Sequence, residues 1–130
     1  MIGSNFKQGQ FCIIEDGVEI GDNVEIKNYV EIRKGCVIGN NVKIGSRVTF
    51  AEGTFIGNNC DIKYGCVFTD TPRIGEKERD PCIIFNNVKM GANVTIMPGI
   101  TIWDNAIIGA CSQVRHDVGM GEIVYGNPAK

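Results

Sequence analysis

Few residues in this sequence of 130 could act as a nucleophile, a general base or a metal ligand near neutral pH. The chain has one histidine, His116, and six cysteines with no C-x-x-C spacing among them. A zinc site needs imidazoles or paired thiolates close together, so we expect no metal site. His116 lies in a polar segment near the C-terminus, where we expect it to be exposed. Proton transfer is therefore left to carboxylates such as Asp70 and Glu31.

A repeat of six residues sets the elements that must position these side chains. Large apolar residues recur at every sixth position from Ile14 to Phe68 and from Ile84 to Val114, and most have a smaller apolar residue two positions earlier. Gly or Asn, which tolerate a positive φ, usually follows three positions later. The pattern predicts an all-β solenoid of short parallel strands and sharp corners around one continuous core. An antiparallel sandwich would need turns roughly 8–12 residues apart without a fixed phase.

Most of the cysteines follow the same repeat. Five occupy the small inward position: Cys12, Cys36, Cys60, Cys66 and Cys82. We expect these five to fill the core as small apolar side chains, whereas Cys111 falls at a corner. Unpaired cysteines suit a reducing compartment, and the first residues contain no signal-peptide core, so the sequence predicts a cytoplasmic protein.

Composition excludes two classes of partner. The net charge is 13 − 15 = −2 and the pI is near 5.4, so no basic field exists to hold nucleic acid. No apolar run approaches the roughly 20 residues that cross a bilayer, so we expect no membrane association. With 43% hydrophobic and 22% charged residues, the chain has the composition of one globular domain.

Two corners break the Gly or Asn rule with large side chains. Tyr29 and Arg47 stand there, eighteen positions apart, which in a three-sided coil places them on the same edge. Breaks in a regular pattern favour functional sites, so substrate binding is one interpretation. The other is that both side chains fill a groove between subunits.

A longer break separates the two runs of hexads. Phe68 and Ile84 are 16 positions apart instead of six, so ten extra residues form a protruding, charged loop at about 69–83. Such a loop is either simply solvated or a binding element, and we expect it near the edge of Tyr29. After Val114 the hexad is lost, which predicts a β-helix domain over 1–117 and a C-terminal arm over 118–130.

The C-terminal hexads carry segments that point to a family. These are Gly91-Ala92-Asn93, Ile96 to Ile102, Ile108-Gly109-Ala110 and Gly126 to Lys130. Together they resemble the hexapeptide-repeat acyltransferases, which use acetyl-coenzyme A (acetyl-CoA). The resemblance implies a left-handed parallel β-helix with three hexads per coil, hence about five coils from sixteen hexads, and a homotrimer with sites between subunits. It also implies that five residues hold coenzyme A in the groove between subunits: Ala92, Gly109, Ala110, Arg115 and Lys130.

The start of the loop narrows the resemblance. Val67-Phe68-Thr69-Asp70, followed by Pro72-Arg73, is similar to nucleotide-amino-sugar N-acetyltransferases, which acylate a 3-amino group on a UDP- or dTDP-linked hexose. This similarity implies a sugar acceptor that contacts Thr69 and Arg73. If the corner residues Tyr29 and Arg47 bind substrate, they contact the same acceptor.

The scarcity of histidine agrees with an amine acceptor. A sugar hydroxyl hardly ionises at pH 7 and needs a base such as imidazole, whereas an amine with a pKa of about 8 is partly neutral already. We therefore expect Asp70 to bind and orient the amine, with Glu31 and Asn28 as secondary candidates, while proximity supplies most of the rate. The alternatives are that Asp70 only caps the loop, that the acceptor is a hydroxyl on another small molecule, or that the solenoid is a non-catalytic scaffold.

Overall fold

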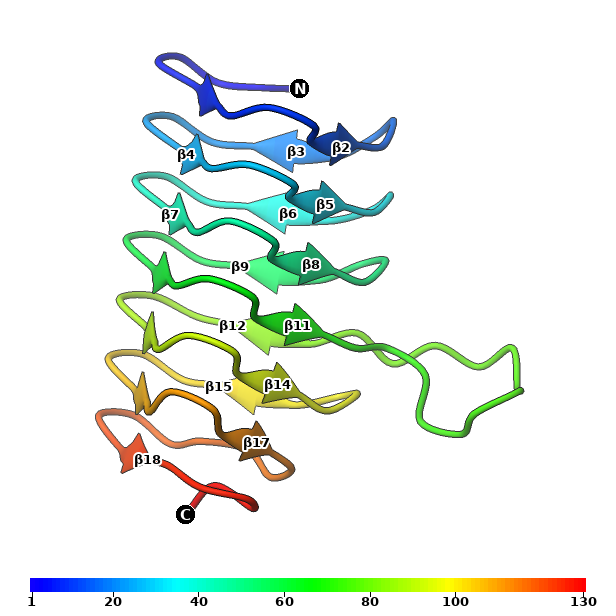
Figure 1. The fold of residues 1–130 in the computed structure, drawn as a ribbon, viewed down its shortest axis with the longest axis vertical. Helices are drawn as coiled ribbons and strands as arrows, with labels where there is room; N and C mark the ends of the chain where they lie inside the picture. The colour runs from blue at the N-terminus through cyan, green and yellow to red at the C-terminus, as the bar shows by residue number, and fades with distance from the viewer.

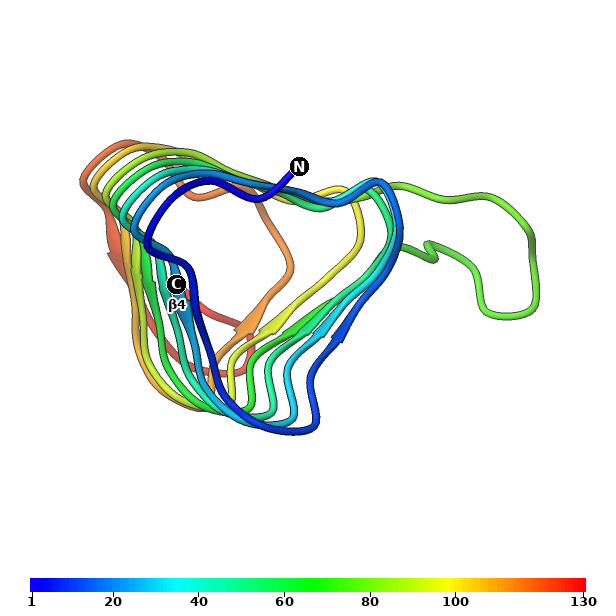
Figure 2. The same cartoon turned by 90° about the horizontal axis from the view of Figure 1, so that it is seen from above.

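A computed structural model describes residues 1–130 as a stack of short parallel strands without a helix (Figure 1). From above, the chain traces a triangle, so three sheets form the walls of a prism (Figure 2). A membrane-crossing helix, which would need a long apolar span, is absent from the structure.

Consecutive strands are assigned to the three walls in turn. Wall 1 contains β1 (Lys7–Gln8), β4 (Glu25–Ile26), β7 (Lys43–Ile44), β10 (Asp61–Ile62), β13 (Lys89–Met90), β16 (Ile107–Ile108) and β18 (Ile123–Val124). Wall 2 contains β2 (Ile13–Ile14), β5 (Glu31–Ile32), β8 (Thr49–Phe50), β11 (Val67–Phe68), β14 (Thr95–Ile96) and β17 (Gln113–Val114). Wall 3 contains β3 (Glu19–Ile20), β6 (Val37–Ile38), β9 (Phe55–Ile56), β12 (Ile83–Ile84) and β15 (Thr101–Ile102).

The solenoid is taller than the five coils expected from the sixteen hexads. Wall 1 has seven strands because β1 and β18 extend the stack at both ends. Neither strand fits the strict hexad: β1 has Gln8 in place of a large apolar residue, and β18 follows a segment that has lost the phase. Both still pair in parallel, β1 with β4 and β18 with β16. Backbone pairing with the neighbouring coil therefore carries the fold past the point where the side-chain pattern stops.

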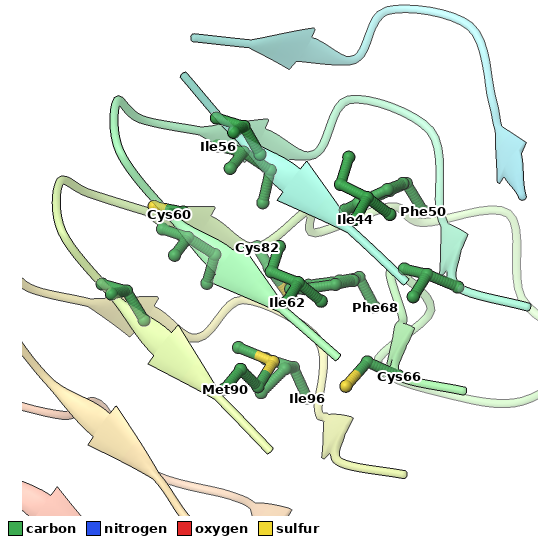
Figure 3. Close-up of a cluster of buried hydrophobic side chains, with 14 of the residues drawn as sticks. Ile44, Phe50, Ile56, Cys60, Ile62, Cys66, Phe68, Cys82, Met90 and Ile96 are labelled. Atoms are coloured by element: carbon green, nitrogen blue, oxygen red, sulfur yellow. The ribbon is translucent and has the colours of Figure 1, made fainter. Parts of the chain in front are cut away.

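The hexad prediction is confirmed by the core. Thirty buried hydrophobic residues form one cluster, with the large inward residues and the small ones before them lining the inside of the prism (Figure 3). Phe50 and Phe68 stack on neighbouring coils with ring centroids 4.9 Å apart. Cys36, Cys60, Cys66 and Cys82 are buried in this core as expected, whereas Cys12, in the first coil, is only partly buried against it. Burial raises the pKa of the Cys82 thiol to about 12. These thiols are protonated core side chains.

The corners have the backbone conformation that the spacing of Gly and Asn predicts. Positive φ recurs at the corner positions, including the non-Gly residues Tyr29 (59°), Arg47 (63°) and Cys111 (62°). Three edges result: edge 1–2 between walls 1 and 2, edge 2–3 between walls 2 and 3, and edge 3–1. Tyr29, Arg47 and Cys111 all belong to edge 1–2, because they follow strands of wall 1. Edge 3–1 is mostly asparagine.

The loop leaves the prism at a different edge from the one expected. It follows β11 of wall 2 and returns to β12 of wall 3, so it replaces a corner of edge 2–3 (Figure 2). Tyr29 precedes wall 2 instead of following it, and therefore lies at the opposite side of that wall. The expectation that the loop emerges near the edge of Tyr29 is wrong, because Tyr29 follows a strand of wall 1 and the loop follows a strand of wall 2.

The C-terminal arm, residues 118–130, is folded against the last coils. Val118 is buried and pairs with Ile102 in a parallel bridge, and Val124 in β18 belongs to the core. Beyond β18, the backbones of Tyr125 and Lys130 exchange two hydrogen bonds. The arm therefore closes the C-terminal end of the prism.

Candidate functional site

A shallow groove on wall 2 brings together the two carboxylates expected from the sequence. It has a volume of about 240 Å³ and is lined by Glu31, Arg33, Thr49, Ala51, Glu52, Phe68, Asp70 and Arg79. Glu31 points outward from β5, and Asp70 follows β11 two coils further along the same wall. The parallel register of wall 2 therefore places Asp70 and Glu31 on one surface.

Asp70 is the more enclosed of these carboxylates. Its side chain is 15% exposed. Its Oδ1 accepts a hydrogen bond of 2.9 Å from the Thr71 hydroxyl, and its Oδ2 lies 3.6 Å from Nε of Arg79. Its backbone carbonyl accepts the N–H of Asp80 at 2.6 Å, which ties the two ends of the loop together. Asp70 thus closes the loop through its backbone and faces the groove through its side chain.

Arg33 organises the other half of the groove. Its guanidinium donates to Glu15 at 2.9 Å and lies 3.6 Å from Glu31 and 3.8 Å from Glu52. The hydrogen bond from Arg33, followed by that from the Lys34 backbone, lowers the pKa of Glu15. Arg33 is shared among three acids, so it offers no undivided counter-charge to a ligand.

Three other residues expected at the site, Asn28, Thr69 and Arg73, do not line the groove. Asn28 lies on edge 1–2, where its Oδ1 accepts the backbone N–H of Gln10 at 2.8 Å. The Thr69 hydroxyl donates to the carbonyl of Ile96 at 2.8 Å, which connects wall 2 to the next coil. Arg73 is exposed in the loop and does not line the groove. The structure therefore gives Asn28 and Thr69 structural contacts and keeps Arg73 apart from Asp70.

Edge 1–2 carries Tyr29 and Arg47 on successive coils, as their spacing predicts. Tyr29 stacks on Phe11 of the preceding coil with centroids 5.2 Å apart and planes 14° from parallel. Both rings are exposed, Phe11 by 71% and Tyr29 by 58%, and Phe11 also has positive φ. Sequence reasoning missed Phe11, although it stands eighteen positions before Tyr29. Positive φ strains the backbone at residues with large side chains, so their presence here favours a functional role.

A second groove runs along wall 1 beside the C-terminal part of edge 1–2. It has a volume of about 280 Å³, and its lining includes Gly91, Gly109, Ala110, Lys63 and Lys89. A Cβ on Gly91 would lie 2.6 Å from the backbone nitrogen of Ala110, so the coils are in close contact here. Sequence reasoning predicted Gly109 and Ala110 but missed the two lysines, which the register of wall 1 places on the rim of the groove.

Two of the three remaining residues expected to bind coenzyme A, Ala92 and Lys130, lie around this groove. Ala92 is one coil from Ala110 on edge 1–2, and its carbonyl accepts the N–H of Cys111 at 2.8 Å. Lys130 pairs through its backbone with Tyr125, and a Cβ on Gly109 would lie 2.8 Å from the Cβ of Tyr125. Arg115 instead follows β17 of wall 2 and is exposed. The structure thus gathers Ala92, Ala110 and Lys130 near the wall 1 groove and leaves Arg115 on the neighbouring wall.

Metal-ligating side chains do not gather anywhere in the fold. No group of three His, Cys, Asp or Glu residues could hold a metal ion. All six cysteines are free, and His116 is exposed near the C-terminal end of wall 2.

Comparison with protein families gives matches over most of the solenoid. The family "Bacterial transferase hexapeptide (six repeats)" matches residues 35–70 and 81–116. "Hexapeptide repeat of succinyl-transferase" matches residues 12–45. Curated protein sequences give no match.

Solved structures share the fold. Serine acetyltransferase from Neisseria gonorrhoeae aligns with 30% identity and a TM-score of 0.69, over 78% of this chain and 40% of its own. The acetyltransferase domain of PglB from the same organism aligns with 16% identity and a TM-score of 0.73, over 97% of this chain and 54% of its own. This chain therefore spans about half or less of the length of these two structures.

A third structure contains two bound ligands. AntD, an N-acyltransferase from Bacillus cereus in complex with dTDP-4-amino-4,6-dideoxyglucose and coenzyme A, aligns with 21% identity and a TM-score of 0.65. The alignment covers 99% of this chain and 80% of AntD. At this level of identity the similarity shows a common fold.

Proposed function

Because this chain belongs to the bacterial transferase hexapeptide family, we propose that it transfers an acetyl group from acetyl-CoA to the amino group of a nucleotide-linked amino sugar. The observation that carries the choice of an amine is the enclosed carboxylate of Asp70 in the wall 2 groove. A carboxylate binds an ammonium group and accepts hydrogen bonds from an amine, but it is a weak base for a sugar hydroxyl. The one imidazole of the chain lies outside this groove.

The wall 2 groove has the groups that amine transfer needs. Asp70 binds the acceptor as its ammonium ion, which gives up one proton to solvent so that the nitrogen lone pair is free to attack. Glu31, two coils away on the same wall, receives a hydroxyl of the sugar. When bound, acetyl-CoA supplies the acyl group on a thioester whose C–S bond breaks as the N–C bond forms. The proton lost by nitrogen passes to Asp70 or to solvent, and the departing sulfur takes up a proton. Positioning supplies most of the acceleration in such a reaction.

The wall 1 groove has the chemistry to hold coenzyme A. Gly91 and Gly109 let the neighbouring coils pack closely at this groove, because a Cβ there would collide with the next coil, and the lining of the groove is mostly apolar. An apolar slot suits the pantetheine arm. Lys89 on its rim supplies positive charge for phosphates, together with Lys130, whereas Lys63 lies 3.4 Å from Asp61 in the same groove. These features support Gly109 and Ala110 as cofactor-binding residues.

A homotrimer with sites between subunits is supported by the apolar surface of wall 3. Phe55, Ile83 and Trp103 are 37%, 39% and 44% exposed, and Phe85 stacks on Trp103 with centroids 4.6 Å apart. An exposed patch of this kind marks an interface. Neither groove lies on wall 3, so a site between subunits also needs a contact that brings the wall 1 groove of one chain to the wall 2 groove of its neighbour. Six free cysteines fit a reducing cytoplasm.

A thiol-release assay tests the reaction. We would supply acetyl-CoA with UDP- and dTDP-linked amino sugars and with the matching sugars that carry a hydroxyl in place of the amine. We expect thiol release with an amine only, and at least about a tenfold lower turnover for Asp70→Ala. Asp16→Ala, which removes an exposed carboxylate outside the groove, is the control. Release with the hydroxyl sugars alone would establish an O-acetyltransferase, and release with neither would favour a scaffold.

A further inference from the structure

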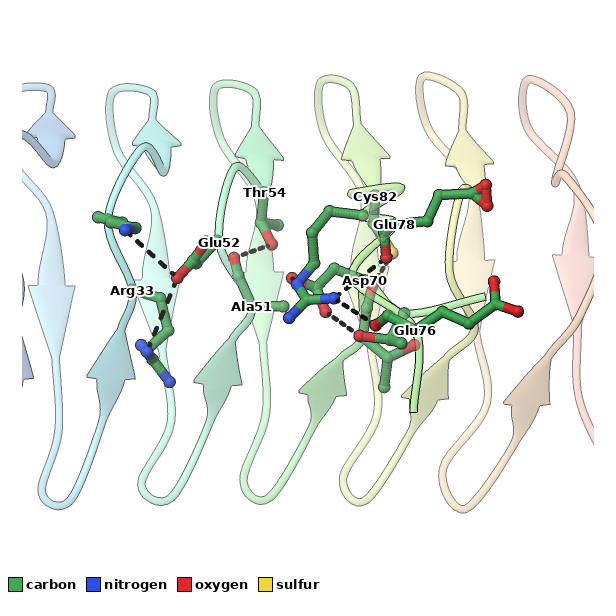
Figure 4. Close-up of polar contacts among 12 residues, drawn as sticks. Arg33, Ala51, Glu52, Thr54, Asp70, Glu76, Glu78 and Cys82 are labelled. Atoms are coloured by element: carbon green, nitrogen blue, oxygen red, sulfur yellow. Dashed lines mark hydrogen bonds and ion pairs between the residues drawn. The ribbon is translucent and has the colours of Figure 1, made fainter. Parts of the chain in front are cut away.

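The return segment of the loop is held over the wall 2 groove. The Asp80 N–H donates to the Asp70 carbonyl at 2.6 Å, and the Gly99 N–H of the following coil donates to the Asp80 carbonyl at 2.8 Å. Nη1 of Arg79 donates to the carbonyls of Glu76 and Glu78, each at 3.1 Å (Figure 4). These bonds orient the guanidinium of Arg79 so that its Nε faces Asp70. The end of the loop is therefore a structured element that reaches into the groove.

Arg79 is the only cation paired with Asp70 in the structure. Oδ1 of Asp70 is already bound by the Thr71 hydroxyl, so Oδ2 faces the guanidinium alone. The neighbouring Arg33 is committed to Glu15, Glu31 and Glu52. The side chain of Asp70 is 15% exposed while that of Arg79 is 48% exposed, so the carboxylate stays in the groove and the guanidinium can withdraw toward solvent.

From this geometry we propose that Arg79 occupies, in the free protein, the cation subsite that the ammonium group of the acceptor takes. Binding of the acceptor then exchanges one cation for another beside Asp70 and releases the end of the loop. The inference rests on the proposed function, because it deepens the role of Asp70 as the group that binds the amine. Arg79 is thereby a specificity-determining residue: a neutral hydroxyl in the same place would leave Asp70 without a counter-charge and so would not displace it.

The exchange must be inexpensive for the acceptor to bind. The Nε to Oδ2 distance of 3.6 Å is longer than a strong charged hydrogen bond, so an ammonium group that contacts Oδ2 directly can replace the guanidinium at little cost. Removing Arg79 should therefore strengthen acceptor binding by roughly two- to fivefold. The same change should loosen the loop, because the guanidinium also holds the carbonyls of Glu76 and Glu78.

Two measurements on Arg79→Gln test the proposal, with Lys77→Gln as the matched control. Lys77 is exposed on the same loop and forms no ion pair. Hydrogen exchange without any ligand should be faster over residues 70–80 in Arg79→Gln and unchanged in Lys77→Gln. With the amine acceptor that supports thiol release, Arg79→Gln should lower KM roughly two- to fivefold at unchanged kcat. Arg79→Lys keeps the charge but offers a single nitrogen, so it should restore the wild-type KM while the loop still exchanges faster than in the wild type.

The outcomes separate this proposal from the function on which it rests. Equal loop exchange in Arg79→Gln and wild type overturns the proposal, because the pair then does not hold the loop. Faster exchange with an unchanged KM overturns the exchange of cations, and a KM raised several-fold shows that Arg79 binds the acceptor directly. If no amine is acylated, the proposed function fails, and the exchange measurement still decides whether Arg79 holds the loop.

Discussion

Arg47 offers a test of whether edge 1–2 is kept for function at the expense of stability. It has φ of 63° and an exposed side chain, and it forms no ion pair. Its backbone N–H donates to the carbonyl of Asn28 at 2.9 Å, a bond that any residue but proline retains. Arg47→Asn should therefore remove backbone strain without removing a side-chain contact.

The magnitude follows from the conformation. The left-handed region costs an ordinary residue roughly 1–2 kcal/mol, and asparagine tolerates it best after glycine. We expect Arg47→Asn to raise the free energy of unfolding by about 1 kcal/mol, equivalent to roughly 3–5 °C in Tm for a chain of this size. If the guanidinium binds a phosphate of the acceptor, the same change should raise KM by about tenfold.

Thermal unfolding at fixed protein concentration and the thiol-release assay measure the two effects. The control is Asn59→Arg, which places the same side chain at an exposed corner of edge 3–1 with φ of 59°. It should lower the free energy of unfolding by about 1–2 kcal/mol and leave KM unchanged. Arg47→Asn that is less stable than wild type would refute the strain argument. A more stable Arg47→Asn with unchanged KM would remove Arg47 from the site.

Three further predictions concern the core and the assembly. Phe68→Ala removes a buried ring that stacks on Phe50 and should lower the free energy of unfolding by about 3–5 kcal/mol in urea titrations; a loss under about 1 kcal/mol would contradict its place in the core. Burial raises the pKa of Cys66 to about 11 and of Cys82 to about 12, so these thiols ionise at lower pH in the unfolded chain than in the folded one. The free energy of unfolding should therefore fall as pH rises above about 9, by about 1 kcal/mol per thiol up to about pH 10. A constant free energy of unfolding over that range in urea titrations would contradict this prediction. Trp103→Glu should dissociate the proposed trimer in analytical ultracentrifugation, because it places a carboxylate in the apolar surface of wall 3, and an unchanged sedimentation coefficient would place the interface elsewhere.

The repeat determined most of the fold because each coil repeats the same packing problem. Large and small inward residues can be read from one phase, and the structure buries nearly all of them. Where the phase is lost, at Gln8 and beyond Val114, backbone pairing still adds strands that no side-chain pattern marks. The number of coils was underestimated for this reason.

The site was only partly predictable, because the repeat fixes the register of residues on the walls but not of those in the loop. Glu31 and Asp70 share wall 2 because register follows from the period, and the same reasoning would have found Phe11 and Lys63. Asn28 was a catalytic candidate, but it stands eighteen positions before Ser46, directly in line with it on the next coil. The Ser46 hydroxyl accepts the N–H of Asn28 at 3.3 Å, so this spacing indicates a hydrogen bond between coils. Arg79 could not be placed, because a loop outside the repeat has no register to fix its side chains.

Calorimetric titration with acetyl-CoA tests the central claim most directly, since every proposed step depends on donor binding in the wall 1 groove. We expect a dissociation constant in the micromolar range for the wild type, a roughly tenfold weaker one for Lys89→Gln on the rim, and no change for Lys7→Gln at the far end of the same wall. Absence of binding at about 1 mM acetyl-CoA, or equal affinity in the Lys89 and Lys7 variants, would contradict the account.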